Sequence, residues 1–170
     1  MMARKIMLLG EIGVGKSSLV RRLVHDRFET DYQATIGVEI SRFEIRGGGP
    51  DGCLDVDLII WDTDGTFGDS ILRHTYIKGA SGALIVGDAT RRTTLEAMRR
   101  IAAGFATALP GRDCVLVLNK MDLLAGQPEP ALPEPLVDGG HILIRTSAKT
   151  GHHVRDAFIE LAVGIVRRGL

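Results

Sequence analysis

The octapeptide GEIGVGKS, from Gly10 to Ser17, has the residue types needed to hold a chain of phosphates. It matches the pattern G-x-x-x-x-G-K-[ST], between an apolar run and a stretch with helical spacing. Glycines let the backbone wrap with its N–H groups pointing inward at a helix N-terminus, where an anion is favoured. Lys16 would reach the terminal phosphates of a nucleoside triphosphate, and the Ser17 hydroxyl would ligate Mg²⁺. The residues predicted to contact the nucleotide here are Glu11, Ile12, Gly13, Val14, Gly15, Lys16, Ser17 and Ser18.

Two tetrapeptides further along the chain could recognise the base of such a nucleotide. NKMD, at 119–122, follows the apolar run CVLVL, and TSAK, at 146–149, follows HILIR. Ligands of open α/β sheets bind at the carboxyl ends of strands, so both tetrapeptides are expected beside the phosphate loop. The Asp122 carboxylate could accept hydrogen bonds from N1–H and the exocyclic amine of guanine. Adenine has no donor at N1 and would leave that carboxylate unpaired, so the two tetrapeptides favour guanine.

The elements that must position these residues follow from hydrophobic spacing. Nearly continuous apolar runs alternate with amphipathic stretches, which is typical of a mostly parallel sheet covered by helices on both faces. The Gly-rich stretch GGGPDG joins two partly alternating runs and predicts an antiparallel hairpin. The predicted strands are 5–10, 38–46, 53–61, 82–89, 113–120 and 141–146, and the predicted helices are 15–28, 93–109 and 154–168.

The segment 125–140, AGQPEPALPEPLVDGG, interrupts this alternation because it holds four of the six prolines. A proline inside a helix costs about 3 kcal/mol, so at most one short helical turn is expected there. An irregular surface loop is the favoured interpretation, and a Pro-rich partner motif is the alternative.

Composition limits the classes of partner. The 21 basic and 21 acidic residues cancel, so the bulk charge gives no reason to expect nucleic acid or an anionic membrane as partner. The two cysteines, Cys53 and Cys114, are too few for a disulfide scaffold or a zinc site. Cys114 lies in an apolar run and is predicted to be a buried, inert thiol.

Targeting signals are not evident in the sequence. The first apolar run stops at Gly10, too early for a signal peptide, and no apolar segment approaches the length of a bilayer span. No cysteine lies near the last residue for prenylation, and no glycine follows the first methionine for myristoylation. We therefore expect a cytoplasmic protein of 170 residues and one domain, without a direct membrane anchor.

With these motifs in this order, the chain resembles the small Ras-like GTPases, and most of all their Rab-type branch. The resemblance runs from Lys5 to about Arg168 and includes RFETDYQATIGVEI, IIWDTDG and YIKGASGALIVGDAT. It implies a single G domain over residues 1–170, with the three-layer α/β fold of P-loop NTPases. That fold has a mostly parallel six-stranded sheet with one antiparallel edge hairpin and helices on both faces.

The resemblance also implies a function. The chain would be a monomeric switch that binds GTP or GDP with Mg²⁺ and hydrolyses GTP. Effector, exchange and activating proteins would bind through switch I, at about 30–40, and switch II, at about 62–78.

The family pattern assigns roles to individual residues. Thr35 would coordinate Mg²⁺ and the γ-phosphate, Asp62 would hold a metal-bound water, and the Gly65 N–H would bind the γ-phosphate. Phe28 would lie across the guanine edge, although in isolation Phe28 would be assigned to the core and Thr35 to an ordinary loop. The metal ligands would be Ser17, Thr35 and Asp62, and the base would be framed by Asn119, Lys120, Asp122, Ser147, Ala148 and Lys149. The catalytic residues would be Lys16, Thr35, Gly65 and Thr66.

Switch II departs from the family pattern, because DTAGQE becomes DTDGTF. Thr66 replaces the glutamine that orients the attacking water, and Asp64 adds a carboxylate near the phosphates. Phosphoryl transfer depends on positioning and charge stabilisation, so binding is expected to persist while unassisted hydrolysis is slow. Ile12 could also crowd the space that an arginine finger would enter. The missing group could come from a partner or from Asp69, Arg73 or His74.

Three functions remain open from the sequence. The first is a regulatory GTPase, and the second is a hydrolysis-deficient pseudo-GTPase that acts as a GTP-locked interaction scaffold. The third is a P-loop ATPase or small-molecule kinase, which Asp122 and the paired base motifs oppose.

Overall fold

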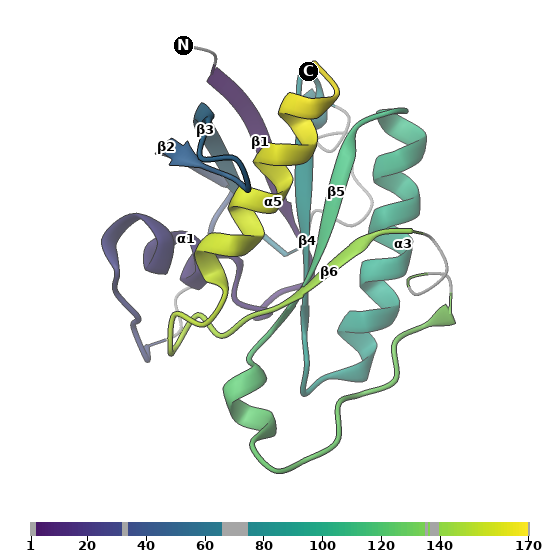
Figure 1. Cartoon of the computed structure of the whole chain (residues 1–170). Helices are drawn as coiled ribbons and strands as arrows, with labels where there is room; N and C mark the ends of the chain where they lie inside the picture. Colours follow the sequence, from purple (N-terminus) through teal and green to yellow (C-terminus); the bar gives the residue numbers. More distant parts are fainter. Residues whose placement is uncertain (1–2, 32–33, 66–74, 135, 137–139, 170) are drawn as a thin grey trace.

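The computed structural model describes residues 3–31, 34–65, 75–134, 136 and 140–169. These residues form a six-stranded sheet in the order β2-β3-β1-β4-β5-β6 (Figure 1). Its strands are β1 Ala3–Leu9, β2 Val38–Gly48, β3 Leu54–Thr63, β4 Gly82–Asp88, β5 Asp113–Asn119 and β6 Ile142–Arg145. The helices whose full bounds lie in the described residues are α1 Lys16–His25, α3 Arg92–Ala108, α5 Val154–Arg167 and the short 3₁₀ helix η1 Met121–Leu124, and residues 75–77 are also helical.

The pairing of the strands confirms the predicted topology. The β2 strand runs antiparallel to β3 at one edge, and the other neighbouring pairs are parallel. The helix predicted at 15–28 is shorter than expected, because Asp26 adopts the left-handed conformation with φ of 50° after α1. A residue in that conformation ends a helix, and aspartate tolerates it better than most side chains.

Two apolar layers flank the sheet. On one face, Leu19 of α1 and Phe158 of α5 pack in one cluster with the strands, and on the other Phe105 of α3 packs in a second cluster. Adjacent residues of β1 belong to different layers, since Ile6 lies in the first cluster and Met7 in the second. Helices on both faces explain why the parallel strands read as nearly continuous apolar runs.

The parallel strands bring their carboxyl ends to one end of the sheet (Figure 1). Leu8, near the end of β1, is in register with Asp62, and Asp88 at the end of β4 is in register with Asn119. Residues separated by dozens of positions in the sequence are therefore neighbours at this end. This is where the polar motifs that follow the strands must meet.

The Pro-rich segment is irregular over residues 125–133, and Glu134 and Leu136 beyond them are helical. Residues 125–133 contain no helix or strand, as predicted. Leu132 and Leu136 pack against the apolar layer that contains α3, and Glu129 forms an ion pair with Arg145. The segment is therefore attached to the domain by apolar contacts and by one exposed ion pair.

Cys114 is only half-buried, which corrects the expectation of a buried side chain. Its Sγ lies 3.4 Å from Nδ1 of His141. Burial, with a smaller effect of Asp113, raises the pKa of the Cys114 thiol to about 11. A thiol that stays protonated at neutral pH is a poor nucleophile, as expected for an inert cysteine.

No helix in the described part of the chain combines the length and apolar character needed to cross a membrane.

Candidate functional site

A cavity of about 470 Å³ opens at the carboxyl end of the sheet. Its volume is typical of sites for small molecules and cofactors. The predicted nucleotide-binding residues that line it are Ile12, Gly13, Gly15, Lys16, Ser17, Ser18, Phe28, Thr35, Gly65, Asn119, Lys120, Asp122, Ala148 and Lys149. Segments far apart in the sequence therefore contribute to one site, and Phe28 belongs to it rather than to the core.

Three of the residues predicted to contact the nucleotide do not line the cavity, and neither does the predicted metal ligand Asp62. Val14 is fully buried in the core, and Ser147 is buried behind the wall, where its hydroxyl donates to Oδ1 of Asp122 at 2.6 Å. Glu11 lies in the phosphate loop, and its backbone carbonyl accepts a hydrogen bond from the Lys16 ammonium. Four further predictions, Thr66, Asp69, Arg73 and His74, fall outside the described residues.

Lys16 lies under the phosphate loop and is only 6% exposed. Its ammonium donates to the carbonyls of Gly10 and Glu11, at 2.9 and 3.0 Å. Burial lowers the pKa of Lys16, while the carboxylates of Asp62, Asp64 and Glu11 oppose that change. The ammonium therefore fixes the first half of the loop and supplies positive charge at its base.

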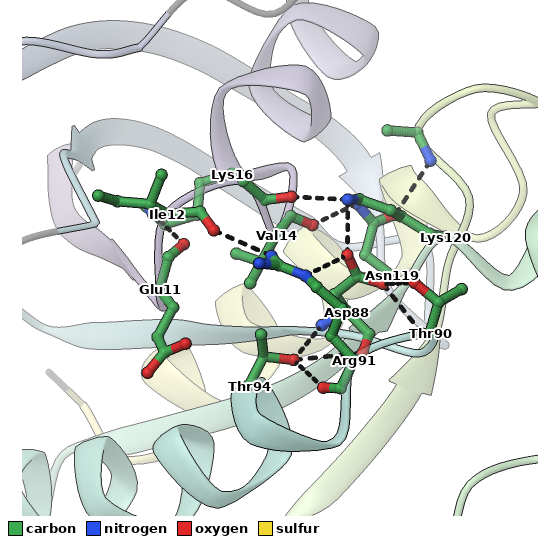
Figure 2. A network of polar contacts seen from close by, with 12 residues as sticks. Glu11, Ile12, Val14, Lys16, Asp88, Thr90, Arg91, Thr94, Asn119 and Lys120 are labelled. Atoms are coloured by element: carbon green, nitrogen blue, oxygen red, sulfur yellow. Dashed lines mark hydrogen bonds and ion pairs between the residues drawn. The ribbon is translucent and has the colours of Figure 1, made fainter.

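The next three carbonyls of the loop are each held by a side chain from another element (Figure 2). The hydrogen bonds run from Arg91 Nη2 to Ile12 O at 2.9 Å, from Lys120 Nζ to Gly13 O at 2.6 Å and from Asn119 Nδ2 to Val14 O at 3.0 Å. The N–H and C=O of one trans peptide point in opposite directions. Carbonyls that bond outward therefore leave the N–H groups turned toward the inside of the loop, where a phosphate would bind.

Ser17, Thr35 and Asp62 form a cluster of oxygen atoms next to Lys16. The Ser17 hydroxyl lies 2.7 Å from the Thr35 hydroxyl and donates to Oδ2 of Asp62. Asp62 is 2% exposed, and its Oδ1 has no hydrogen-bond partner. Burial raises the pKa of Asp62, although Ser17 and Lys16 act in the opposite direction. A divalent cation would satisfy the unpaired oxygen, and Mg²⁺ is commonly held by one or two carboxylates together with substrate phosphates.

No group of three or more His, Cys, Asp or Glu side chains suited to a metal occurs among the residues that the structure describes. A cation here would be held by the Ser17 and Thr35 hydroxyls and by oxygens of a bound ligand, beside the Asp62 carboxylate.

Asn119 joins three loops of the site. Its Oδ1 accepts hydrogen bonds from the Thr146 hydroxyl and the Ala148 N–H, both at 3.1 Å, while its Nδ2 donates to Val14. A Cβ on Gly15 would lie only 2.3 Å from Asn119 Nδ2, so glycine is required for this approach. The phosphate loop and the two base motifs are thus held at fixed positions relative to one another.

Arg22 was not singled out from the sequence, yet it supports the same wall of the cavity. Its guanidinium extends from α1 and donates to the carbonyls of Ala148 and Lys149, at 2.9 and 2.6 Å. Helix α1 therefore contacts the phosphate loop at its start and the TSAK loop through Arg22. No local sequence pattern could have indicated this contact, since 126 residues separate Arg22 from Ala148.

Asp88 was also missed, and it organises the charges beneath the loop (Figure 2). The carboxylate is 1% exposed and accepts from Arg91 Nε at 3.0 Å and from Lys120 Nζ at 2.6 Å. Burial alone would raise the pKa of Asp88, but hydrogen bonds from Lys120, Thr90 and Arg91 bring the pKa below its ordinary value. The available signal was an acidic residue at the end of a fully apolar strand.

The two predicted switch segments touch each other and the phosphate loop. The Asp64 N–H donates to the carbonyl of Gly37 at 3.0 Å and extends the β2–β3 pairing beyond the strands. A Cβ on Gly65 would lie 2.1 Å from the backbone nitrogen of Ile12. Gly65 therefore packs directly on the phosphate loop.

Comparison with known proteins shows which family shares this arrangement. Residues 5–167 match the model of the Ras family. The chain belongs to the Ras family. Among similar proteins, this Ras-family chain is 33% identical to human Ras-related protein Rab-4A over 168 residues, which covers 96% of the chain and 75% of Rab-4A. It is 31% identical to rat Rab-4B over 172 residues and 33% identical to the GTP-binding protein yptV2 of Volvox carteri over 168 residues. These alignments cover 96% of the chain and 76% of each relative.

These findings confirm the resemblance to Rab-type small GTPases that the sequence motifs indicated. The six-stranded sheet with its antiparallel β2–β3 edge is the G-domain fold of this Ras-family chain. Membership implies a switch that binds GTP or GDP with Mg²⁺, and it supports GTP hydrolysis. The interpretation as an ATPase or small-molecule kinase is therefore set aside.

Substitution of Arg22 tests whether its hydrogen bonds to the TSAK loop contribute to nucleotide affinity. We expect Arg22→Ala to weaken GDP binding about tenfold, because the TSAK loop loses two hydrogen bonds from a charged donor. Isothermal titration of nucleotide-free protein with GDP measures the change. Arg99→Ala is the matched control, since Arg99 pairs at 3.6 Å with Glu96 on α3. Equal GDP affinities for Arg22→Ala and Arg99→Ala would contradict the supporting role.

Proposed function

We propose that residues 1–170 form one G domain that acts as a guanine-nucleotide switch and hydrolyses GTP slowly without assistance. The observation that carries the proposal is that one cavity is lined by the phosphate loop, the NKMD and TSAK motifs, Thr35 and Gly65. A guanine nucleotide would place its phosphates in the loop beside Lys16 and its base near Asp122. Family membership supports this ligand class.

Mg²⁺ would be held by Ser17 and Thr35, with Asp62 beside it. The unpaired, buried Oδ1 of Asp62 supports this assignment, as does the contact of 2.7 Å between the two hydroxyls. When bound, the cation would neutralise charge that develops on the phosphates during transfer. Lys16 would add a second fixed positive charge, and the Gly65 N–H would contact the γ-phosphate.

Switching would follow from contacts that depend on the γ-phosphate. Thr35 belongs to switch I and Gly65 to switch II, and the Gly37–Asp64 hydrogen bond connects the two segments. Loss of the γ-phosphate would release both segments together. Ile36 is 95% exposed and Ile40 is 56% exposed, which gives an effector apolar side chains to cover at switch I. Exchange and activating proteins would act on the same segments.

Slow hydrolysis is proposed because Thr66 stands where the family pattern has a glutamine. Single-turnover GTP hydrolysis of the wild type and Thr66→Gln tests this. We expect Thr66→Gln to be faster by about tenfold, since a longer side chain with an amide can orient the attacking water. Thr107→Gln, the same change at an exposed position of α3, should match the wild type. Fast wild-type turnover that Thr66→Gln leaves unaltered would contradict a limiting role for residue 66.

A GTP-locked pseudo-GTPase is the second candidate. It is favoured by the Asp64 carboxylate in the wall of the cavity and by the half-exposed Ile12 side chain beside Gly65. Both features would disturb a water molecule or an arginine finger near the γ-phosphate. Chromatographic identification of the nucleotide that co-purifies with the protein separates the candidates. Bound GTP would favour the locked form, bound GDP would favour a working cycle, and no guanine nucleotide would contradict tight binding.

A further inference from the structure

Arg91 makes a contact with the phosphate loop that the proposed function does not use. It lies immediately before α3, and its Nη2 donates to the carbonyl of Ile12 at 2.9 Å. The Arg91 backbone is itself fixed, because its N–H donates to Asp88 O at 3.0 Å and its carbonyl accepts from Thr94. The guanidinium therefore extends from a rigid part of the main chain.

A second contact orients the Arg91 guanidinium. Its Nε donates to Oδ2 of Asp88 at 3.0 Å while Nη2 reaches Ile12 (Figure 2). Asp88 is buried at the end of β4 and also accepts from Lys120. A planar guanidinium can serve two acceptors at once with nitrogens of fixed separation, whereas lysine has a single nitrogen. The geometry therefore depends on arginine and not on positive charge alone.

The residue that Arg91 holds is the one that meets switch II. A Cβ on Gly65 would lie 2.1 Å from Ile12 N and 2.4 Å from Ile12 Cα, so the two backbones are in direct contact. The following carbonyls, of Gly13 and Val14, have their own donors in Lys120 and Asn119. Loss of the Arg91 side chain would therefore release the Ile12 end of the loop and leave the rest restrained.

We propose that Arg91 is a positioning residue that holds Ile12 against Gly65 and thereby favours GTP over GDP. The inference rests on the proposed function, in which the γ-phosphate binds at Gly65. GDP lacks the phosphate that would lie at this end, so its binding would rest more on the loop beside Lys16 and Ser17, which line the same cavity. Displacement of Ile12 therefore affects a GTP analogue more than it affects GDP.

The test compares dissociation constants for GDP and for a non-hydrolysable GTP analogue, both with Mg²⁺. We expect Arg91→Ala to weaken the analogue about tenfold, the size of one lost hydrogen bond from a charged donor, and to weaken GDP less than about threefold. Arg92→Ala, an exposed arginine on the same turn, is the control and should change neither constant. Arg91→Lys should recover less than half of the preference for the GTP analogue over GDP that Arg91→Ala loses. The single nitrogen of lysine cannot donate to both Asp88 and Ile12.

The outcomes separate this inference from the proposed function. A wild type that binds neither guanine nucleotide overturns both. If the wild type binds, equal losses for both nucleotides in Arg91→Ala, or no difference from Arg92→Ala, overturn only the role of Arg91. Full recovery of the GTP preference in Arg91→Lys also overturns it, because charge alone would then explain the effect. Arg91→Lys decides the question even if Arg91→Ala does not fold.

Discussion

Replacement of Lys16 by alanine is expected to weaken GDP binding about 10²- to 10³-fold, the size associated with removing one partner of a buried charge pair. The ammonium is 6% exposed and lies at the base of the loop in which the phosphates would bind. Without it, the phosphate charge would enter a partly desolvated site that lacks the buried ammonium at its base. The hydrogen bonds that hold Gly10 and Glu11 would be lost as well.

The stability of the nucleotide-free protein should change much less than the affinity. Burial lowers the pKa of Lys16, so keeping its charge in the empty site already has an energetic cost. Calorimetric titration with GDP and thermal unfolding of the nucleotide-free protein measure the two effects separately. Lys78→Ala, which removes an exposed lysine, is the matched control and should retain wild-type affinity. A Lys16→Ala variant that binds GDP within tenfold of the wild type would contradict the predicted role.

Asp122 is expected to determine the choice of base. The Ser147 hydroxyl donates to its Oδ1 at 2.6 Å, which orients the carboxylate at the wall of the cavity. We expect Asp122→Ala to weaken GDP about a hundredfold, because two hydrogen bonds to a charged acceptor are lost. The same change should remove the preference for GDP over IDP, since inosine lacks only the exocyclic amine. Competition titrations with GDP, IDP and ADP provide the measurement.

A gain of binding makes this test specific. In Asp122→Asn, the amide can donate to the additional carbonyl oxygen of xanthine, so XDP should bind better to the variant than to the wild type. A partly unfolded protein could not gain affinity for a new base. Asp51→Asn, at the exposed tip of the β2–β3 hairpin, makes the same substitution away from the cavity and should not alter base choice. Equal binding of ADP and GDP by the wild type would reject the assignment.

The order of the elements could be predicted because it depends on local spacing. In β1, the run KIMLL has too little polarity for an exposed strand. In α1, the apolar pair Leu19 and Val20 recurs four residues later at 23 and 24, a helical interval. The hairpin between β2 and β3 was marked by its glycines. The end of α1 was predicted less well, because Asp26 ends the helix in a left-handed conformation that hydrophobic spacing does not indicate.

The composition of the site was partly predictable for a topological reason. A parallel sheet brings the carboxyl ends of its strands together, so motifs that follow β1, β5 and β6 had to meet once the strands were recognised. Lys16, Asp122 and the TSAK loop could thus be assigned to one cavity. The buried positions of Val14 and Ser147 were not foreseen, because a sequence motif does not tell which of its side chains face the ligand.

The sequence by itself determined the alternation of strands and helices, the phosphate loop and the two base motifs, because each depends on residues adjacent in the chain. Only the tertiary structure decided that Asp88, Arg91 and Arg22 hold those motifs in place. Arg91 is 79 residues from Ile12, and Arg22 is 126 residues from Ala148. No periodicity or spacing relates such residues, since their contacts arise only when the packed sheet brings α1, α3 and the loops to the same end.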